Sequence, residues 1–147
     1  MKKMFGMLGV FIFLMGCGQA AESNRAVSGA APAKIAWMHD FELAKSQAAA
    51  ANKPLMLDFY ADWCGWCKRM DKDTFAHADV AGRSEKFICV KINGDNQRQL
   101  MQQFGVQGFP TTVFLRPDGT RIETVPGYVP AQQFVRVMDE VLSKMQQ

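Results

Sequence analysis

The apolar residues of this chain occur in runs with two different spacings, which alternate along most of its length. Short, nearly continuous apolar runs at 54–60 and 86–92 predict strands that are covered on both faces. Two further strand-like runs, 111–116 and 121–125, flank Pro117-Asp118-Gly119, which is typical of a hairpin turn. The sequence therefore predicts two buried strands and one antiparallel pair.

Helical spacing is found in four other stretches, at 40–52, 64–75, 96–104 and 130–145. Asp40 and Asp95 are the predicted N-caps of the first and third helices. The inward-facing positions expected for the helices are Phe41, Ala44, Ala48, Ala51, Met70, Phe75, Phe134, Val135, Met138, Val141, Leu142 and Met145. The order helix–strand–helix–strand–helix–strand–strand–helix predicts an α/β fold, with a mixed central β-sheet flanked by α-helices.

Composition is that of a single globular domain. The chain has 147 residues, of which 48% are hydrophobic and 21% charged, and this excludes a disordered or collagen-like chain. Four cysteines are too few to form the framework of a domain of this size. Removing Lys2 and Lys3 leaves 15 of the 17 basic residues against 14 acidic residues, a net charge of +1. A nearly neutral domain lacks the electrostatic footprint of a nucleic-acid-binding protein.

Residues 1–16 are typical of an export signal. A short basic start is followed by an uncharged run that falls well below the roughly 20 apolar residues of a membrane-spanning helix. Leu14-Met15-Gly16-Cys17 then resembles the bacterial lipobox, which implies cleavage before Cys17 and lipidation of its sulfur. The alternative is an ordinary secretory signal that is cut near Ala20 or Ala21. Both interpretations predict an exported protein.

The segment after the predicted signal has a different character. Residues 17–34 are mostly small and polar, without apolar periodicity, and predict a lipidated N-terminus and flexible tether. The remaining residues, 35–147, form the predicted folded domain.

The motif Trp63-Cys64-Gly65-Trp66-Cys67-Lys68 follows a buried strand and opens a helix. Two residues between cysteines on a first helical turn bring both sulfurs within disulfide range. The free amides of the helix N-terminus favour the thiolate of Cys64, while Cys67 lies one turn deeper. We therefore expect Cys64 to attack a substrate disulfide and Cys67 to resolve the mixed disulfide.

A structural disulfide and half of a zinc site are the alternative interpretations of this motif. Zinc requires a second pair of ligands, and the spare candidates Cys89, His39 and His77 are not paired at a suitable spacing. We therefore expect no metal and no bound cofactor. Cys89 lies in an apolar run and is interpreted as a buried small residue without a catalytic role.

At these residues the chain resembles the thioredoxin family, and most closely the carboxy-terminal domain of the bacterial thiol:disulfide interchange protein D. The resemblance covers roughly 53–142. It is carried by Lys53-Pro-Leu-Met-Leu-Asp-Phe-Tyr-Ala-Asp-Trp-Cys64, Cys67-Lys68, Thr74-Phe75, Val106-Gln-Gly-Phe-Pro-Thr111 and Gly127-Tyr128. It implies a thioredoxin fold and a redox-active Cys64–Cys67 pair.

The resemblance also assigns roles to three charged residues. Asp58 matches a buried acid that relays a proton for Cys67, and burial is expected to raise its pKa; a structural polar residue is the alternative. Lys91 matches a lysine that approaches this acid, and otherwise is a surface charge at a strand end. Asp71 matches an acid near the active site that disfavours the Cys64 thiolate, and otherwise is a solvated helix charge.

Four residues are expected to contact substrate. Phe109 precedes Pro110, which matches the cis-proline of the family, and this position binds an extended substrate peptide. Trp63 matches the residue beside the nucleophile. Trp66 departs from the family pattern, because thioredoxins carry proline there and oxidases often carry histidine, and an exposed indole would widen apolar contact with partners.

These features together predict an exported, membrane-anchored thiol:disulfide oxidoreductase on the periplasmic side of a bacterial membrane, most simply a monomeric reductase of protein disulfides. Its electron donor would be a membrane protein of the interchange type. The alternatives are a soluble periplasmic protein, a disulfide oxidase or isomerase, and a non-catalytic binding or metal-carrier module.

Overall fold

The computed structural model describes residues 34–147. The predicted signal peptide, the lipidation site Cys17 and the tether up to residue 33 lie outside the described residues. Within the described part, none of the helices combines the length and the apolar character that crossing a membrane requires.

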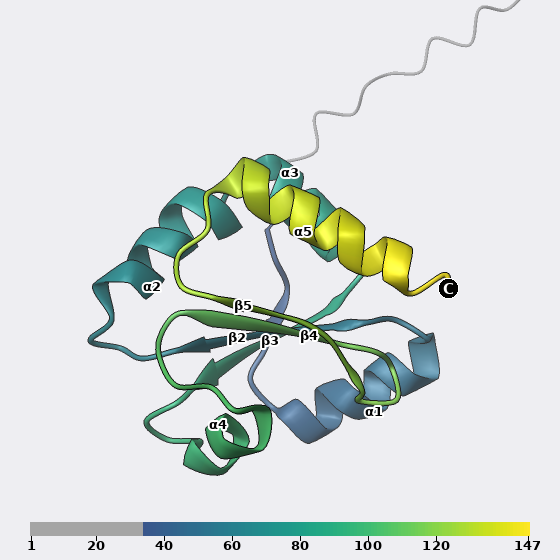
Figure 1. The fold of residues 1–147 in the computed structure, drawn as a ribbon, viewed down its shortest axis with the longest axis horizontal. Helices are drawn as coiled ribbons and strands as arrows, with labels where there is room; N and C mark the ends of the chain where they lie inside the picture. Colours follow the sequence, from purple (N-terminus) through teal and green to yellow (C-terminus); the bar gives the residue numbers. More distant parts are fainter. Residues whose placement is uncertain (1–33) are drawn as a thin grey trace, which may run out of the picture.

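A five-stranded sheet forms the centre of the domain (Figure 1), with the strand order β1-β3-β2-β4-β5. Its strands are β1 (Trp37–Met38), β2 (Leu55–Tyr60), β3 (Ile88–Asn93), β4 (Thr111–Leu115) and β5 (Arg121–Pro126). The first three run parallel to one another, and β4 and β5 are antiparallel to their neighbours. This is the mixed sheet that the sequence predicts, and the thioredoxin fold is confirmed.

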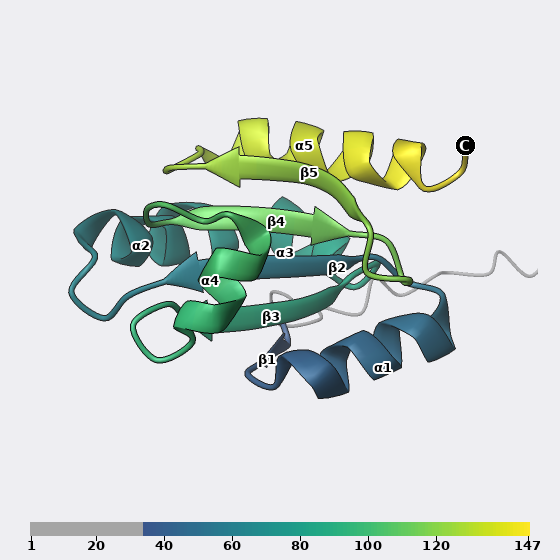
Figure 2. The same ribbon diagram turned by 60° about the horizontal axis from the view of Figure 1, so that its bottom comes forward.

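Helices cover both faces of the sheet, as Figures 1 and 2 show. They are α1 (Phe41–Ala51), α2 (Gly65–Met70), the π-helical turn η1 (Asp71–Phe75), α3 (Ala78–Ser84), α4 (Arg98–Phe104) and α5 (Ala131–Lys144). Side chains of α1 and α4 form one apolar cluster with the sheet, and side chains of α2, η1, α3 and α5 form the other. Because side chains alternate along a strand, Leu57 faces the first cluster and Met56 faces the second.

Most helix signals in the sequence are confirmed. The Asp40 side chain accepts a hydrogen bond from Leu43 N at 2.9 Å and caps α1, and Asn52 ends the helix in the left-handed conformation. The stripe on α5 is buried at Phe134, Val135, Met138 and Val141. The prediction for Ala51 is wrong, because this last residue of α1 is exposed.

Four local features differ from the predictions. The strand β1 and the helix α3 are not predicted, since two residues and seven residues are too short for a clear period. The helix predicted at 64–75 changes to π-helical hydrogen bonding at Asp71. The fourth difference is at Asp95, which does not cap α4; the helix begins after Gln97, and the Asp95 carboxylate binds Trp63 instead.

Candidate active site

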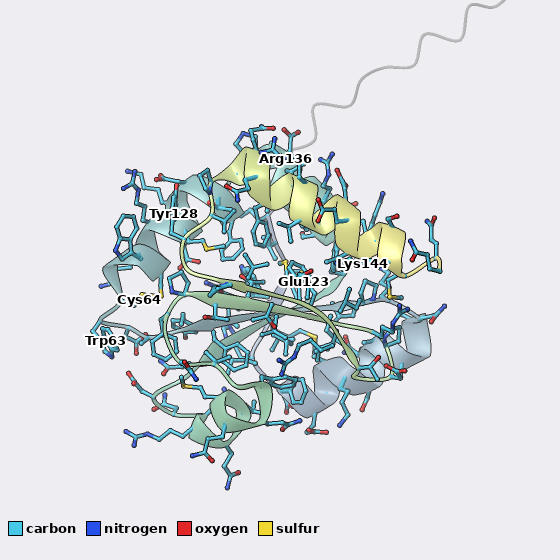
Figure 3. The ribbon with its side chains drawn as sticks, in the orientation of Figure 1. Trp63, Cys64, Glu123, Tyr128, Arg136 and Lys144 are labelled. Atoms are coloured by element: carbon cyan, nitrogen blue, oxygen red, sulfur yellow. A yellow bond between two sulfur atoms is a disulfide. The ribbon has the colours of Figure 1, made fainter. Side chains whose placement is uncertain are left out.

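Cys64 and Cys67 form a disulfide at the start of α2, directly after the loop that leaves β2. Their Cα atoms are 5.3 Å apart, and Cys67 N donates a hydrogen bond to Cys64 Sγ at 3.1 Å. Cys64 is therefore the N-cap residue of α2, where unpaired amide groups favour a sulfur anion over a thiol. Figure 3 shows Cys64 at the edge of the molecule, near Trp63 and Tyr128.

Both sulfur-bearing residues are largely covered, at 6% exposure for Cys64 and 3% for Cys67. They pack with Ala61, Tyr60 and Phe109. Cys67 is the more buried of the two, as expected from its position one turn into the helix, although the difference in the disulfide form is small. The exposed part of the site consists of Trp63 and Trp66, which are 71% and 56% exposed.

The exposed Trp63 is held in place by two contacts. Its Nε1 donates a hydrogen bond to Asp95 Oδ2 at 2.9 Å, and its ring meets the edge of Phe109 at a centroid distance of 5.9 Å. Asp95 lies just after β3, at the same end of the sheet as α2. Sequence reasoning assigned Asp95 to a helix cap and missed this contact, since it joins residues from two separate loops.

The Phe109–Pro110 peptide bond is cis, and Phe109 packs against the disulfide. Gly94 explains how the Phe109 ring fits at this place. A Cβ atom at residue 94 would collide with the Phe109 ring and with the sulfur of Met101. Because glycine lacks that atom, the loop after β3 can run directly against the residue that precedes the cis-proline.

A shallow groove of about 350 Å³ lies beside the disulfide and is lined by Trp66, Phe109, Pro110, Gly127 and Tyr128. The Trp66 and Tyr128 rings are 5.6 Å apart, and the Arg69 guanidinium lies 5.4 Å from the first and 5.2 Å from the second. Tyr128 and Arg69 were not among the predicted substrate contacts. The Gly127-Tyr128 motif was the available signal for the tyrosine, while nothing in the sequence pattern pointed to Arg69.

Asp58 lies on β2 beneath α2 and is 1% exposed. Burial raises its pKa from 3.8 to about 6, and the ammonium group of Lys91, which donates to Asp58 Oδ2 at 2.7 Å, opposes the shift. The expected direction of the pKa change and its physical cause therefore agree with the structure. An acid with such a pKa accepts or releases a proton near neutral pH.

Lys91 joins Asp58 to Asp71, because its ammonium group hydrogen-bonds both carboxylates. It lies at 5.0 to 5.2 Å from the centroids of the Trp37, Tyr60 and Phe75 rings. Burial lowers the pKa of this lysine, but the two carboxylates outweigh burial and raise it, so Lys91 stays charged.

This environment bears on the alternatives that the sequence left open for Lys91 and for Asp71. Lys91 is buried, so the interpretation as a surface charge at a strand end is wrong. Asp71 is about half exposed, at the start of η1, but its carboxylate binds Lys91 and is not merely a solvated helix charge. A pocket of about 390 Å³ borders both residues and is walled by Trp37 and Phe75.

The remaining cysteine of the described chain is separate from this site. Cys89 is buried on β3, burial raises the pKa of its thiol to about 12, and its Sγ donates to Ser84 O at 3.7 Å. Over residues 34–147, no three His, Cys, Asp or Glu side chains are grouped closely enough to hold a metal ion.

Comparison with known proteins agrees with this geometry. Residues 41–142 match the family described as thioredoxin-like domain. The thiol:disulfide interchange protein DsbD of Photorhabdus laumondii is 34% identical over 99 residues, which cover 63% of this chain and 17% of that protein. The protein disulfide isomerase-like 5-2 of Oryza sativa is 50% identical over 65 residues, which cover 44% of this chain and 15% of that protein.

A solved structure gives a match over a whole domain. The oxidised C-terminal domain of DsbD from Neisseria meningitidis is 29% identical, with a TM-score of 0.60, over 71% of this chain and 98% of that domain. The chain spans less than a fifth of the length of the two curated relatives. The family match covers most of the chain, and the disulfide lies at the start of α2. The chain therefore belongs to the thioredoxin-like family of disulfide oxidoreductases, with Cys64 and Cys67 as its C-x-x-C pair.

Proposed function

We propose that this chain is an exported, membrane-anchored thiol:disulfide reductase that acts on protein disulfides. The observation that carries the proposal is the position of the Cys64–Cys67 disulfide. It lies at a helix N-terminus beside two exposed indoles, and the strand that leads into this helix carries a buried carboxyl with a pKa of about 6. That combination provides a stabilised thiolate, a surface for a protein partner and a proton acceptor.

The proposed cycle transfers two electrons and needs no cofactor. In the dithiol form, the Cys64 thiolate attacks one sulfur of the substrate disulfide, and the other substrate sulfur leaves as a thiolate. Cys67 then loses its proton and attacks Cys64 Sγ, which releases the second substrate thiolate and forms the Cys64–Cys67 disulfide. The substrate disulfide is reduced and the Cys64–Cys67 dithiol is oxidised, so an external dithiol must reset the pair.

Asp58 is the proposed acceptor of the Cys67 proton. A carboxyl with a pKa of about 6 is mostly ionised at pH 7 and can therefore take up a proton. The carboxylate is fixed because its Oδ2 is bound to Lys91, which also hydrogen-bonds Asp71 at the start of η1, directly after α2. Lys91 and Asp71 thus modulate the proton relay through Asp58.

The proposed docking surface for the substrate consists of Trp63, Trp66, Phe109 and Pro110. The groove beside Pro110 is apolar along Trp66 and Tyr128, which suits an extended segment with an apolar side chain next to its disulfide. The resemblance to the interchange proteins supports a membrane protein of that type as electron donor, and a periplasmic location for the exchange. No dimeric contact is needed for this chemistry, and we propose a monomer.

The direction of electron flow can be measured directly. We expect a reduction potential of about −200 to −270 mV for the Cys64–Cys67 pair, the range of thioredoxins and glutaredoxins. The measurement is equilibration with glutathione or dithiothreitol buffers, followed by quantification of the two thiols. A potential near −120 mV, typical of a strong oxidant, would contradict the reductase and favour an oxidase.

Isomerase activity is the second candidate function, because the Oryza sativa relative is named a disulfide isomerase-like protein. A refolding assay with a scrambled disulfide substrate separates the two functions. A reductase returns the substrate as free thiols at the expense of its donor. An isomerase restores the native pairing without net consumption of the donor.

The membrane anchor is tested by changing the proposed acylation site. We expect the Cys17→Ser variant to move from the membrane fraction into the soluble fraction, because its sulfur can no longer carry a lipid. Cell fractionation with labelled fatty acid measures both properties, and Cys89→Ser serves as the matched cysteine control. A Cys17→Ser variant that stays membrane-bound would contradict lipidation at Cys17 as the anchor. It would favour an ordinary secretory signal and a different attachment to the membrane.

A further inference from the structure

Two buried oxygen atoms lie opposite each other on neighbouring strands, and neither has a hydrogen-bond partner among the described residues. They are Asp58 Oδ1 on β2 and Thr112 Oγ1 on β4. Each residue is 1% exposed, so bulk water does not reach either side chain. Because an unpartnered buried polar atom costs about 1–3 kcal/mol, two of them on directly paired residues require an explanation.

The register of the sheet places these side chains in one row. Asp58 pairs with Thr112 across the antiparallel β2–β4 ladder, and with Lys91 across the parallel β2–β3 ladder. Residues that are directly opposite in an antiparallel pair project from the same face of the sheet. The flanking pair Met56 and Phe114 belongs to the apolar cluster under α2 and α5, so Asp58 and Thr112 lie under the same helices.

The charged groups around Asp58 come from two elements. Lys91 on β3 and Asp71 on η1 are the groups whose charges act on it. The nearest side chains from the other elements on this face are uncharged: Met70 of α2, Val125 of β5 and Phe134 of α5. Farther along β5, Glu123 pairs with Phe114 on the same face and is neutralised by Lys144 of α5. Cys89 is also on this face, and it is neutral because its thiol pKa is raised to about 12. In this apolar environment Thr112 offers the additional hydroxyl group.

The two carboxyl oxygens of Asp58 are not equivalent. Oδ2 accepts a hydrogen bond from the Lys91 ammonium group, which can only donate, so a proton taken up by the carboxyl resides on Oδ1. The ionised Oδ1 needs a donor, and the protonated Oδ1 needs an acceptor. A hydroxyl group satisfies both requirements, because it donates one hydrogen bond and accepts others.

We propose that Thr112 is a positioning residue whose hydroxyl group hydrogen-bonds Asp58 Oδ1, donating to the carboxylate and accepting from the carboxylic acid. A rotation about χ1 moves this hydroxyl between staggered positions. The role rests on the proposed function, in which Asp58 takes up the Cys67 proton: Lys91 fixes one carboxyl oxygen, and Thr112 keeps the proton on the other.

The test is a ¹³C NMR titration of the Asp58 carboxyl carbon in the oxidised protein. We expect Thr112→Val, which keeps the side-chain shape, to raise the Asp58 pKa by about 0.5 to 1 on the pH scale. The reason is that a hydrogen bond to a charged acceptor is stronger than one to a neutral group. Thr112→Ser restores the hydroxyl group and should titrate like the wild type.

Thr124→Val is the matched control. The Thr124 hydroxyl on β5 is also buried without a partner, but the residue pairs with Val113 and so projects from the other face of the sheet. This variant should leave the Asp58 titration unchanged. Thr112→Ala, which also lacks the hydroxyl group, replaces the valine variant if that variant does not fold.

Two outcomes would overturn the proposal: an unchanged Asp58 titration in Thr112→Val, or in Thr112→Ala if it replaces the valine variant; or a Thr112→Ser variant that shifts as far as the variant that lacks the hydroxyl group. The titration uses no substrate and no electron donor. A protein that shows the expected shifts but fails to reduce disulfides would therefore refute the proposed reductase function and leave the Asp58–Thr112 pair intact.

Discussion

Replacing Cys64 with serine is expected to reduce disulfide reductase activity by about a thousand-fold or more. A serine hydroxyl stays protonated at neutral pH and cannot replace the thiolate that the N-terminus of α2 stabilises, so the first exchange step is lost. The measurement is the reduction of insulin disulfides with dithiothreitol as donor. Activity close to that of the wild type would mean that Cys64 is not the nucleophile.

Two further cysteine variants make this result specific. Cys67→Ser keeps the attacking sulfur but lacks the resolving one, so it should accumulate covalent complexes with partner proteins, visible as bands that a reductant removes. Cys89→Ser should retain activity, because Cys89 is buried on β3 with a thiol that stays protonated. Mass spectrometry of the trapped complexes would identify the substrates.

We expect the Asp58→Asn substitution to stabilise the oxidised protein at pH 8. This stabilisation relative to the wild type should be about 2 to 3 kcal/mol larger at pH 8 than at pH 4. The folded-state pKa of about 6 exceeds 3.8, the ordinary pKa of a solvated aspartate. The folded state therefore binds more protons than the unfolded state between these values, and its stability falls as the pH rises through this window. The difference of about two pH units corresponds to roughly 3 kcal/mol.

Urea unfolding at pH 4, 6 and 8 measures this effect, and Asp118→Asn provides a control of opposite sign. Hydrogen bonds from Thr120 lower the pKa of Asp118, so its contribution to stability is present at high pH and is lost on acidification. An Asp58→Asn variant with the same pH dependence as the wild type would show that Asp58 does not titrate with a raised pKa.

The stabilised Asp58→Asn variant should be a slower enzyme. An amide cannot accept the Cys67 proton, and the loss of a positioned proton acceptor typically costs about a hundred-fold or more. The loss should appear in the release of substrate from the mixed disulfide rather than in its formation. Single-turnover kinetics with a fluorescent disulfide peptide separates the two steps.

The features that short stretches of sequence determine were predictable. The C-x-x-C motif lies at a helix start because a buried strand precedes it, and the apolar stripe on α5 follows from regular spacing alone. The position of Asp58 on a covered strand also follows from the length and character of its apolar run.

The features that depend on contacts between distant segments were not predictable. β1 is too short for a pattern, yet it supplies Trp37, which covers the Lys91 ammonium group. The sequence could not distinguish a surface position from a buried position for Lys91. Its burial depends on η1, because this turn brings the Asp71 carboxylate to the lysine when it packs on the sheet. Asp95 binds an indole from another loop and so could not act as the expected helix cap.

The restrained position of Trp63 has a consequence for the thermodynamics of association. Ordering a free side chain at an interface costs about 0.5–1.5 kcal/mol in conformational entropy. The Trp63 ring is open to solvent, but its hydrogen bond to Asp95 and its edge contact with Phe109 have already limited its rotamers in the unbound protein. The ring is therefore preorganised for a protein that docks beside the disulfide. Much of the entropic cost of ordering it has already been met during folding, and it no longer reduces the free energy of binding.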